Sequence, residues 1–215
     1  MAGLELAQRH AAWLGRPPET CAAELESLAS LLLKWNAVQN LVSRETVPLL
    51  WERHIADSLQ LLPLLPAQPK LILDLGSGGG FPALPLAVAL KGTATRLQLV
   101  EPVQKKASFL RTVIRELELP ATVAVQRAEQ IDSRETGPVD VITSRALAAL
   151  PQLLGLAYPF FGPGTVALLH KGQEHVEELR ESDSAWSYDV VVHPSATDLR
   201  GVLLHITHLR PQPGI

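Results

Sequence analysis

Cysteine is almost absent from this chain of 215 residues, which contains only Cys21. A single cysteine allows neither an intramolecular disulfide nor a cysteine-rich metal site, and it does not conflict with a reducing compartment. Long apolar runs are lacking too. Hydrophobic residues make up 47% of the chain, yet no uninterrupted stretch approaches the roughly 20 residues that span a bilayer. With Glu5 near the start, the first residues do not resemble a signal peptide. We therefore expect a cytoplasmic protein without membrane contact.

Excess positive charge is the third thing that the chain lacks. It has 19 basic and 22 acidic residues, for a formal net charge of -3, which argues against a broad nucleic-acid-binding surface. Residues 70–146 hold 10 basic and 8 acidic residues, so a polyanion would meet only a local patch. The seven histidines suggest no metal site, because pairs such as His205 and His208 point to opposite faces of a predicted strand.

The most informative stretch comprises residues 71–82. Its first five residues are apolar except for Asp74 and predict a buried parallel strand, after which glycines dominate. The spacing of these glycines does not match the dinucleotide-binding motif G-x-G-x-x-G. Counted from Gly76, its last glycine is replaced by Phe81, and counted from Gly78 it is replaced by Ala83, which only the permissive form of the motif accepts.

The pattern that fits is an acidic residue followed by alternating glycines, Asp74-x-Gly76-x-Gly78-x-Gly80. It resembles the first motif of S-adenosylmethionine-dependent methyltransferases. A glycine-rich turn in another kind of α/β protein is the alternative. The resemblance implies a Rossmann-like fold with S-adenosylmethionine at the carboxyl edge of the sheet.

Alternating elements predict the same fold class. After residues 71–75 we expect strands at 95–101, 122–126, 139–143 and 165–171, separated by helices, which indicates a doubly wound parallel sheet. Two closing strands, 186–193 and 202–209, are joined too tightly for a helical crossover, so the last should run antiparallel. Helices at 4–14, 21–40 and 46–58 form an N-terminal appendage. We expect two units, an appendage at 1–66 and a methyltransferase domain at 67–215.

Two carboxylates follow predicted strands at the glycine-loop edge of the sheet. Glu101 lies 25 positions after Gly76, where a carboxylate can accept hydrogen bonds from both ribose hydroxyls of a nucleoside. The alternative is that Glu101 is a solvent-exposed carboxylate at the end of a strand, with no role in ligand binding. Glu129 lies where methyltransferases of this architecture place an acidic or polar residue against adenine. It is equally explained as a helix-start charge favoured by the helix dipole.

Three cations at the same edge are candidates for substrate contact. Arg145 follows the strand 139–143, where it either contacts the methyl acceptor or pairs with Asp74 or Glu101. Lys105 and Lys106 lie in the first turn of a predicted helix, where cations oppose the dipole. Such violations of a local rule are expected at functional sites, so we predict phosphate contact there; solvated surface lysines are the ordinary explanation.

The possible methyl acceptors are limited by the catalytic residues that the sequence lacks. Methylation at C5 of a pyrimidine needs a nucleophilic cysteine, but Cys21 lies in the N-terminal appendage. Exocyclic adenine methylation usually accompanies an Asn/Asp-Pro-Pro-aromatic loop, where this chain has residues 143–146, Thr-Ser-Arg-Ala. Guanine N7 is already nucleophilic and needs only alignment with the methyl group. We therefore assign no catalytic acid or base.

Several segments across about residues 30–205 carry a family resemblance: Asn40-Leu41, Arg53-His54-Ile55-Ala56-Asp57-Ser58, Gly76-Ser77-Gly78-Gly79-Gly80-Phe81-Pro82, Lys105-Lys106, Phe109-Leu110, Arg127-Ala128-Glu129, Ser144-Arg145-Ala146, Lys171-Gly172 and Arg200. Together they resemble the bacterial 16S rRNA guanine-N7 methyltransferases, also called the glucose-inhibited division protein B family. The resemblance implies methylation of one guanine in the decoding-region (530) loop. Because the negative net charge gives little non-specific RNA affinity, we expect recognition of this loop within the assembled or partly assembled 30S subunit.

From the motif, from position and from this resemblance, we expect a cofactor site and a substrate site. The cofactor would be bound by Asp74, Gly76, Ser77, Gly78, Gly80, Phe81, Glu101, Ala128, Glu129 and Arg145. The RNA or site-edge candidates are Arg53, His54, Lys105, Lys106, Arg127, Arg145, Lys171 and Arg200. Two rival functions stay open: a methyltransferase acting on a small molecule or protein, and a non-catalytic nucleotide-binding module.

Overall fold

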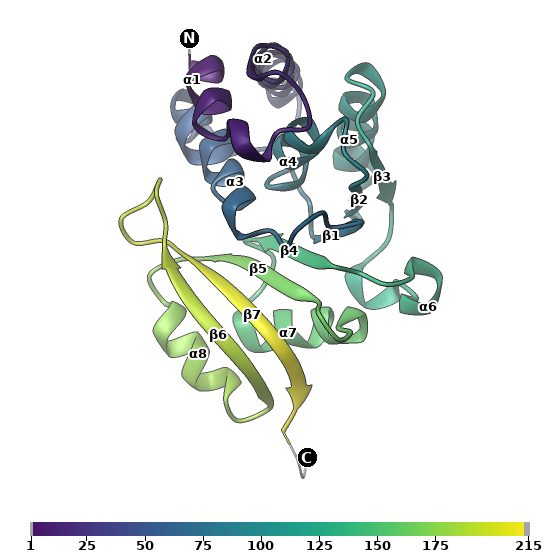
Figure 1. The fold of residues 1–215 in the computed structure, drawn as a ribbon, viewed down its shortest axis with the longest axis vertical. Coiled ribbons are helices and arrows are strands. Elements are labelled where there is room, and N and C mark those ends of the chain that lie inside the picture. The colour runs from purple at the N-terminus through teal and green to yellow at the C-terminus, as the bar shows by residue number, and fades with distance from the viewer. Residues whose placement is uncertain (1, 213–215) are drawn as a thin grey trace.

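Seven strands form one sheet in the computed structural model, which describes residues 2–212. The strand order is β3-β2-β1-β4-β5-β7-β6 (Figure 1). β1 to β5 pair in parallel, whereas β7 runs antiparallel to both β5 and β6. The predicted mostly parallel sheet with an antiparallel last strand is therefore confirmed. The strands are β1 (Leu71–Leu75), β2 (Arg96–Val100), β3 (Ala121–Ala124), β4 (Val141–Arg145), β5 (Val166–Lys171), β6 (Trp186–Pro194) and β7 (Val202–Pro211).

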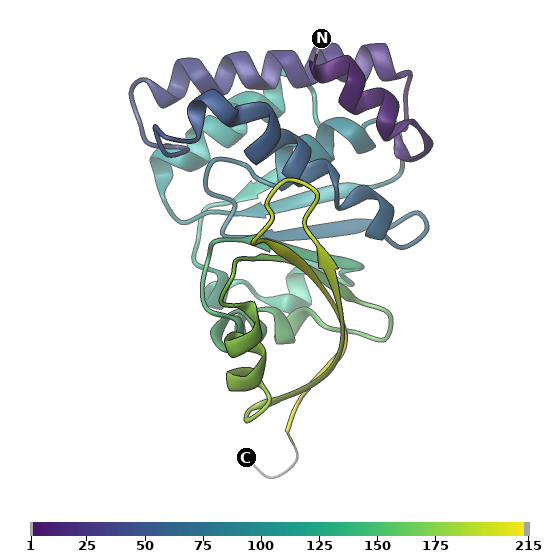
Figure 2. The ribbon, with the colours of Figure 1, turned by 90° about the vertical axis from the view of Figure 1, so that its left-hand side faces the viewer.

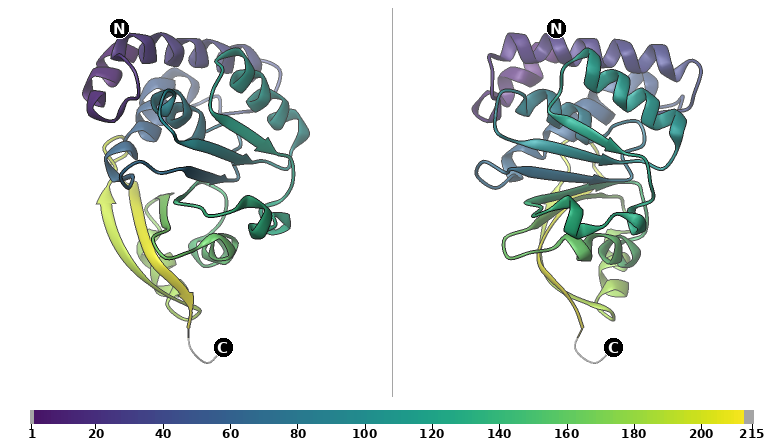
Figure 3. Two further views of the ribbon diagram at one scale, coloured as in Figure 1. Left: turned by 45° about the vertical axis from the view of Figure 1, so that its right-hand side comes forward. Right: turned by 90° about the vertical axis from the view of Figure 1, so that its right-hand side faces the viewer.

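Helices cover both faces of the sheet, and two N-terminal helices form an outer layer over one of them (Figures 1 and 3). α1 packs on α2, and α2 packs on α4 and α5. α6, α7 and α8 lie on the other side of the sheet. The helices are α1 (Ala2–Arg9), η1 (Ala11–Trp13), α2 (Pro18–Asn36), η2 (Val47–Leu49), η3 (Trp51–Ala56), α3 (Asp57–Leu59), η4 (Leu62–Leu64), α4 (Ala83–Leu90), α5 (Gln104–Glu116), η5 (Ala128–Gln130), α6 (Ser133–Thr136), α7 (Leu150–Ala157), η6 (Tyr158–Phe160) and α8 (His175–Ser182).

The core consists of two apolar clusters separated by the sheet. Because side chains alternate along a strand, Ile72 of β1 faces the cluster of α2, α4 and α5, whereas Leu73 and Leu75 face the cluster of α7. Leu25 and Leu28 of α2 are fully buried in the first cluster. The N-terminal helices thus share a core with the sheet, while the predicted boundary at residue 66 stays a prediction.

The predicted helix at 46–58 is helical but irregular. Its hydrogen-bond pattern changes from a 3-10 turn (η2) to a π-helix (η3) and ends in one α-helical turn (α3). π-Helical turns are rare and often occur at functional sites. Apolar periodicity could not predict this change. It indicates which face of a helix is buried, but not to which carbonyl each backbone N–H donates.

A membrane-crossing helix would need a long apolar segment. Among residues 2–212, no helix combines the required length with the required apolar character.

Candidate active site

The glycine loop after β1 uses backbone conformations that favour glycine. Gly76, Gly78 and Gly80 have φ angles of +72°, +54° and +89°, in the left-handed region that glycine enters without a Cβ penalty. At Gly76 a Cβ would lie 2.6 Å from a methyl carbon of Leu147, but at Gly78 the nearest atom would be 3.8 Å away. The alternating glycines therefore produce a tight turn that leaves open space beside Gly78.

Glu101 anchors this loop from the end of β2. Its Oε2 accepts a hydrogen bond from the N–H of Gly78 and its Oε1 accepts one from the N–H of Val103, each at 2.8 Å. The side chain is buried, with 4% exposure. Each carboxylate oxygen has a second lone pair, so Glu101 can still accept hydrogen bonds from a ligand in the loop.

Asp74 lies beneath the same loop and is fully buried. Thr143 of the neighbouring strand β4 donates its hydroxyl to Asp74 Oδ1 at 2.7 Å, whereas Asp74 Oδ2 is buried with no hydrogen-bond partner. Burial disfavours the charged carboxylate and raises the pKa of Asp74 to about 6. The acid of the sequence motif is therefore a buried support of the loop.

A pocket of about 500 Å³ opens over the glycine loop, and we call it the glycine-loop pocket. Pocket volumes of this order hold small ligands and cofactors. Its lining combines the loop with Glu101, with the segment 41–43 and with residues 145–147. The carbonyl of Leu41 would be 2.7 Å from a Cβ at Gly79, so the N-terminal appendage forms one wall at very close approach.

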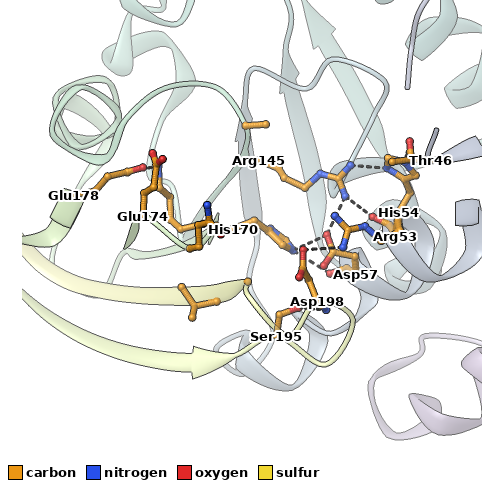
Figure 4. A pocket seen from close by; sticks show the side chains of 16 residues that line it. Thr46, Arg53, His54, Asp57, Arg145, His170, Glu174, Glu178, Ser195 and Asp198 are labelled. Carbon is orange, nitrogen blue, oxygen red and sulfur yellow. Dashed lines mark hydrogen bonds and ion pairs between the residues drawn. The ribbon is translucent and has the colours of Figure 1, made fainter. Parts of the chain in front are cut away.

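A second pocket of about 500 Å³ adjoins the first, and we call it the Asp57 pocket (Figure 4). It is lined by η3 and α3, by the end of β5, by the start of α8 and by the loop between β6 and β7. Four residues, Thr46, His54, Arg145 and Ala146, line both pockets. They form a shared wall through which the two spaces face each other.

Arg145 is held in this wall by groups from the N-terminal appendage. Its Nη1 donates to the carbonyl of Arg53 and to Asp57 Oδ2, both at 2.9 Å, and its Nη2 bonds His54 Nδ1. Its guanidinium carbon lies 5.5 Å from the centre of the Phe81 ring, within cation–π range. The ion pair with Asp74 or Glu101, which was the alternative to acceptor contact, is not formed, and Arg145 pairs with Asp57 instead.

His54 completes the wall as a neutral ring. Arginine can only donate, so His54 Nδ1 must accept and the proton sits on Nε2, 2.9 Å from Thr46 Oγ1. Burial, and then the charge of Arg145, lower the pKa of His54 to about 4. Both ring nitrogens are engaged at neutral pH, and the ring packs 4.9 Å from Phe81.

We expect His54 to make stability depend on pH. Because its pKa falls from 6.5 in the unfolded chain to about 4 in the fold, its contribution is present above pH 6.5 and is lost as the pH falls toward 4. The difference in free energy of unfolding between the wild type and His54→Gln should therefore become smaller by about 2 kcal/mol when the pH is lowered from 7.5 to 5. Urea unfolding of both proteins measures this difference. Asp74 titrates in both and cancels, so an unchanged gap would contradict the neutral-histidine assignment.

Asp57 connects Arg145 with the Asp57 pocket. Besides Arg145, its carboxylate accepts hydrogen bonds from Thr197 Oγ1 at 2.6 Å and from Gln60 Nε2 at 2.7 Å, and it lies 3.5 Å from His170 Nε2. Burial is the largest cause of the lowered pKa of His170. One carboxylate thus joins the shared wall to the β6–β7 loop.

The sequence of the chain matches a known protein family. Residues 21–207 match the model of the family described as rRNA small subunit methyltransferase G. The ribosomal RNA small subunit methyltransferase G of Bartonella quintana is 45% identical over 190 residues, which cover 87% of this chain and 86% of the relative. That of Bartonella bacilliformis is 41% identical over 211 residues, with 96% and 97% covered. The chain belongs to this family.

Solved structures agree on the fold of this methyltransferase G family member. An O-methyltransferase from Bacillus cereus, in complex with SAH, superimposes with a TM-score of 0.59 at 19% identity and covers 84% of this chain and 90% of its own. A methyltransferase from Geobacter sulfurreducens gives 0.56 at 15% identity, with 84% and 88% covered. The chain has the Rossmann-like fold of S-adenosylmethionine-dependent methyltransferases.

The structure brings most of the expected cofactor residues together. Gly76, Ser77, Gly78, Phe81, Glu101 and Arg145 line the glycine-loop pocket, whereas Asp74 and Gly80 do not: Asp74 is buried against Thr143 and Gly80 packs against Leu84. Ala128 and Glu129, at the start of η5, line neither pocket. Their role in cofactor binding stays a prediction.

The expected RNA or site-edge residues differ in the pocket that they line. His54 and Arg145 line both pockets. Arg53 and Lys171 line only the Asp57 pocket and Lys106 only the glycine-loop pocket, whereas Lys105, Arg127 and Arg200 are exposed outside both. The ammonium of Lys171 pairs with Glu178 and donates to the carbonyl of Ala148 at 3.1 Å, so it is committed within the fold. Within residues 2–212, no three His, Cys, Asp or Glu side chains gather as a metal site would require.

Sequence reasoning missed Asp57, Thr46 and Asp198 as members of the site. Asp57 was quoted only as part of a resembling segment, although it holds Arg145 across 88 positions of sequence. No local pattern reports such a long-range partner. Arg53 and His54 lie in η3 and Asp57 begins α3, a spacing that in the sequence looks like ordinary helix.

Proposed function

We propose that this chain transfers a methyl group from S-adenosylmethionine to N7 of a guanine in the decoding-region (530) loop of 16S rRNA. Membership in the rRNA small subunit methyltransferase G family supports an rRNA acceptor. The observation that carries the proposal is the shared wall: two pockets meet at Thr46, His54, Arg145 and Ala146. One pocket suits a cofactor and the other an acceptor base.

The glycine-loop pocket fits S-adenosylmethionine on its own chemistry. Open space beside Gly78 allows close approach to the main chain, and the buried Glu101 carboxylate can accept hydrogen bonds from the two ribose hydroxyls. When bound, this cofactor supplies a methyl group on a positively charged sulfur. Arg145 of the shared wall and Phe81, which packs against His54 of that wall, would orient the reacting end of the cofactor and keep water away from it.

The ionisable groups of the shared wall favour an acceptor that needs no general base. His54 is neutral with both nitrogens hydrogen-bonded, and Asp57 is paired with Arg145. Neither is free to remove a proton. Guanine N7 carries an available lone pair, so alignment of the two reactants supplies the acceleration. Arg145 would hold the base without taking part in proton transfer, and its charge is balanced by Asp57.

The overall charge favours a structured acceptor. With a net charge of -3, non-specific phosphate attraction is weak, so recognition would depend on RNA shape in the assembled or partly assembled 30S subunit. The reaction would accordingly take place in the cytoplasm, where ribosomal subunits are built.

The test offers methyl-labelled S-adenosylmethionine to 30S subunits, to stripped 16S rRNA and to total protein and small-molecule extract. We expect label in 16S rRNA from at least one of the first two, mapping to N7-methylguanine in the 530 loop. Label confined to protein or small molecules would support the rival methyltransferase. Cofactor binding without transfer to any acceptor would support a nucleotide-binding module.

Lys105 and Lys106 provide a prediction on RNA contact. If both contact phosphates, replacing both with Glu should weaken binding of the acceptor RNA and reduce the slope of log affinity against log salt by about 1.5. Filter binding across salt concentrations measures the slope. Arg111→Glu with Arg115→Glu, later in α5, is the matched control and should leave the slope near that of the wild type. Equal slopes in all three proteins would leave the lysines as solvated surface residues.

A further inference from the structure

Leu199 stands out from the surface beside the Asp57 pocket. Its relative exposure is 106%, the highest of the large apolar residues within the described range 2–212. Single exposed apolar residues are normal in soluble proteins and by themselves mean little. Leu199 differs because of the loop that carries it and because of where that loop lies.

The loop between β6 and β7 is held rigid by its own hydrogen bonds. Residues 198–201 form a turn in which the N–H of Gly201 donates to the carbonyl of Asp198 at 2.9 Å, while Asp198 Oδ1 accepts the N–H of Arg200 at 3.0 Å. Asp at the first and Gly at the fourth position are typical of such turns. Ser195 N–H closes the loop on the carbonyl of Gly201 at 3.0 Å. Leu199 therefore occupies the tip of a defined turn.

Side chains of η3 and α3 tie the same loop to the site. Thr197 donates to Asp57 at 2.6 Å, and Arg53 pairs with Asp198 at 2.7 Å. The N–H of Ala196 donates to Gln60 Oε1 at 2.8 Å. Figure 2 shows the loop reaching up beside this N-terminal segment. An apolar tip on a loop anchored at three points is presented in one position.

The position is the rim of the acceptor space. Ser195, Asp198 and Gly201, from the same loop as Leu199, line the Asp57 pocket. The exposed Arg200 follows directly in the sequence. The negative charge of Asp198 is compensated by the N–H of Arg200 and by the Arg53 guanidinium, which lower the pKa of Asp198 in that order. On the β6–β7 loop itself a polyanion therefore meets no unpaired carboxylate, whereas the exposed Glu174 lines the pocket from the segment before α8.

We propose that Leu199 is an apolar wedge that takes the stacking place of the guanine when this base leaves the RNA and enters the Asp57 pocket. The inference rests on the proposed function. A base that must reach a pocket has to leave its stack, which costs a few kcal/mol of stacking and pairing. Apolar side chains inserted between bases are a known way to offset that loss. Arg200 beside the wedge would contact the adjoining phosphate.

A rigid loop makes the wedge effective. If the loop had to become ordered on binding, part of the stacking recovered by Leu199 would be lost to conformational entropy. The hydrogen bonds to Asp57, Gln60 and Arg53 order the loop in the free protein, so RNA binding does not have to cost this conformational entropy. The same Asp57 carboxylate holds Arg145, so the wedge and the shared wall keep a fixed relation.

The test compares wild type, Leu199→Ala, Leu199→Met and Val191→Ala. Val191 is 55% exposed on β6 of the same hairpin and lines neither pocket, so Val191→Ala is the matched control. Because Leu199 is fully exposed, its removal should leave the free energy of unfolding unchanged. We expect kcat/KM for the labelled acceptor to fall about tenfold or more in Leu199→Ala, and to stay near the wild-type value in Leu199→Met and Val191→Ala.

A second readout separates base displacement from general loss of affinity. 2-Aminopurine, which becomes more fluorescent when unstacked, replaces the methylated guanine in whichever acceptor the wild type labels. At saturating protein we expect a rise with wild type and Val191→Ala and a smaller rise with Leu199→Ala. Equal kcat/KM and equal fluorescence for Leu199→Ala and wild type would overturn the wedge. Absence of labelling by the wild type would instead reject the proposed function, and the wedge with it.

Discussion

Gly78→Asp is expected to lower the affinity for S-adenosylmethionine by 100-fold or more and to abolish detectable methyl transfer. The new side chain would occupy the open space beside the loop and place a second carboxylate next to Glu101, whose Oε2 lies 2.8 Å from the Gly78 nitrogen. Like charges at such close range repel strongly where water is excluded. Calorimetric titration with the cofactor measures the loss.

Gly137→Asp is the matched control for the backbone. Gly137 also has a positive φ, +77°, and a Cβ there would meet no atom within 4 Å. It lines neither the glycine-loop pocket nor the Asp57 pocket. Aspartate tolerates the left-handed region better than most residues. Gly137, with φ +77° and ψ -171°, lies in a region that glycine alone adopts readily, so Gly137→Asp is a stringent control for backbone strain. Cofactor affinity is compared only between variants whose circular dichroism shows that they are folded. Cofactor affinity of folded Gly78→Asp within threefold of the wild type would place the cofactor elsewhere.

Arg145→Lys should reduce kcat/KM by about 100-fold, because a displacement of about 1 Å at a positioning group can cost that much. Lysine keeps the charge but loses the planar fork that reaches Asp57, His54 and the Arg53 carbonyl together. Arg145→Ala should also lower the free energy of unfolding by about 3–5 kcal/mol, because Asp57 would remain as a largely buried charge without its cationic partner. Methyl-transfer kinetics and urea unfolding measure the two effects.

Arg134→Lys controls for a general arginine effect. Arg134 is 89% exposed and pairs locally with Asp132, so its replacement should change neither kinetics nor stability. A wild-type kcat/KM in Arg145→Lys would show that positive charge alone suffices at the shared wall. That result would contradict the role of the fork geometry.

The sheet could be predicted from sequence because its signals are local. Short apolar runs bounded by glycine and proline mark parallel strands, and the tight 186–209 hairpin fixes the direction of the last strand. The positive φ angles of the loop could also be predicted from the local sequence, because glycine has no Cβ and adopts these angles more readily than other residues. The observed seven-stranded, mostly parallel sheet agrees with the Rossmann-like architecture that the motif implied, whereas its strand order was not predicted.

The shared wall could not be predicted, because its partners are distant in sequence. For Arg145 the sequence left two alternatives, contact with the methyl acceptor or an ion pair with Asp74 or Glu101. Glu101 instead holds loop N–H groups, Asp74 is buried against Thr143, and the guanidinium turns to Asp57. The choice depends on how the N-terminal appendage packs over the sheet edge, which no periodicity in the sequence encodes. Lys171 illustrates the same point, since its Glu178 partner appears only once β5 and α8 are in place.

The most direct measurement is a crystal structure with S-adenosylhomocysteine, the product of the proposed transfer. We expect its ribose on Glu101 beside Gly78 and its sulfur facing Arg145 at the shared wall, open to the Asp57 pocket. A molecule bound outside the glycine-loop pocket, or bound there with its sulfur turned away from Arg145, would contradict the assignment of the two pockets to cofactor and guanine.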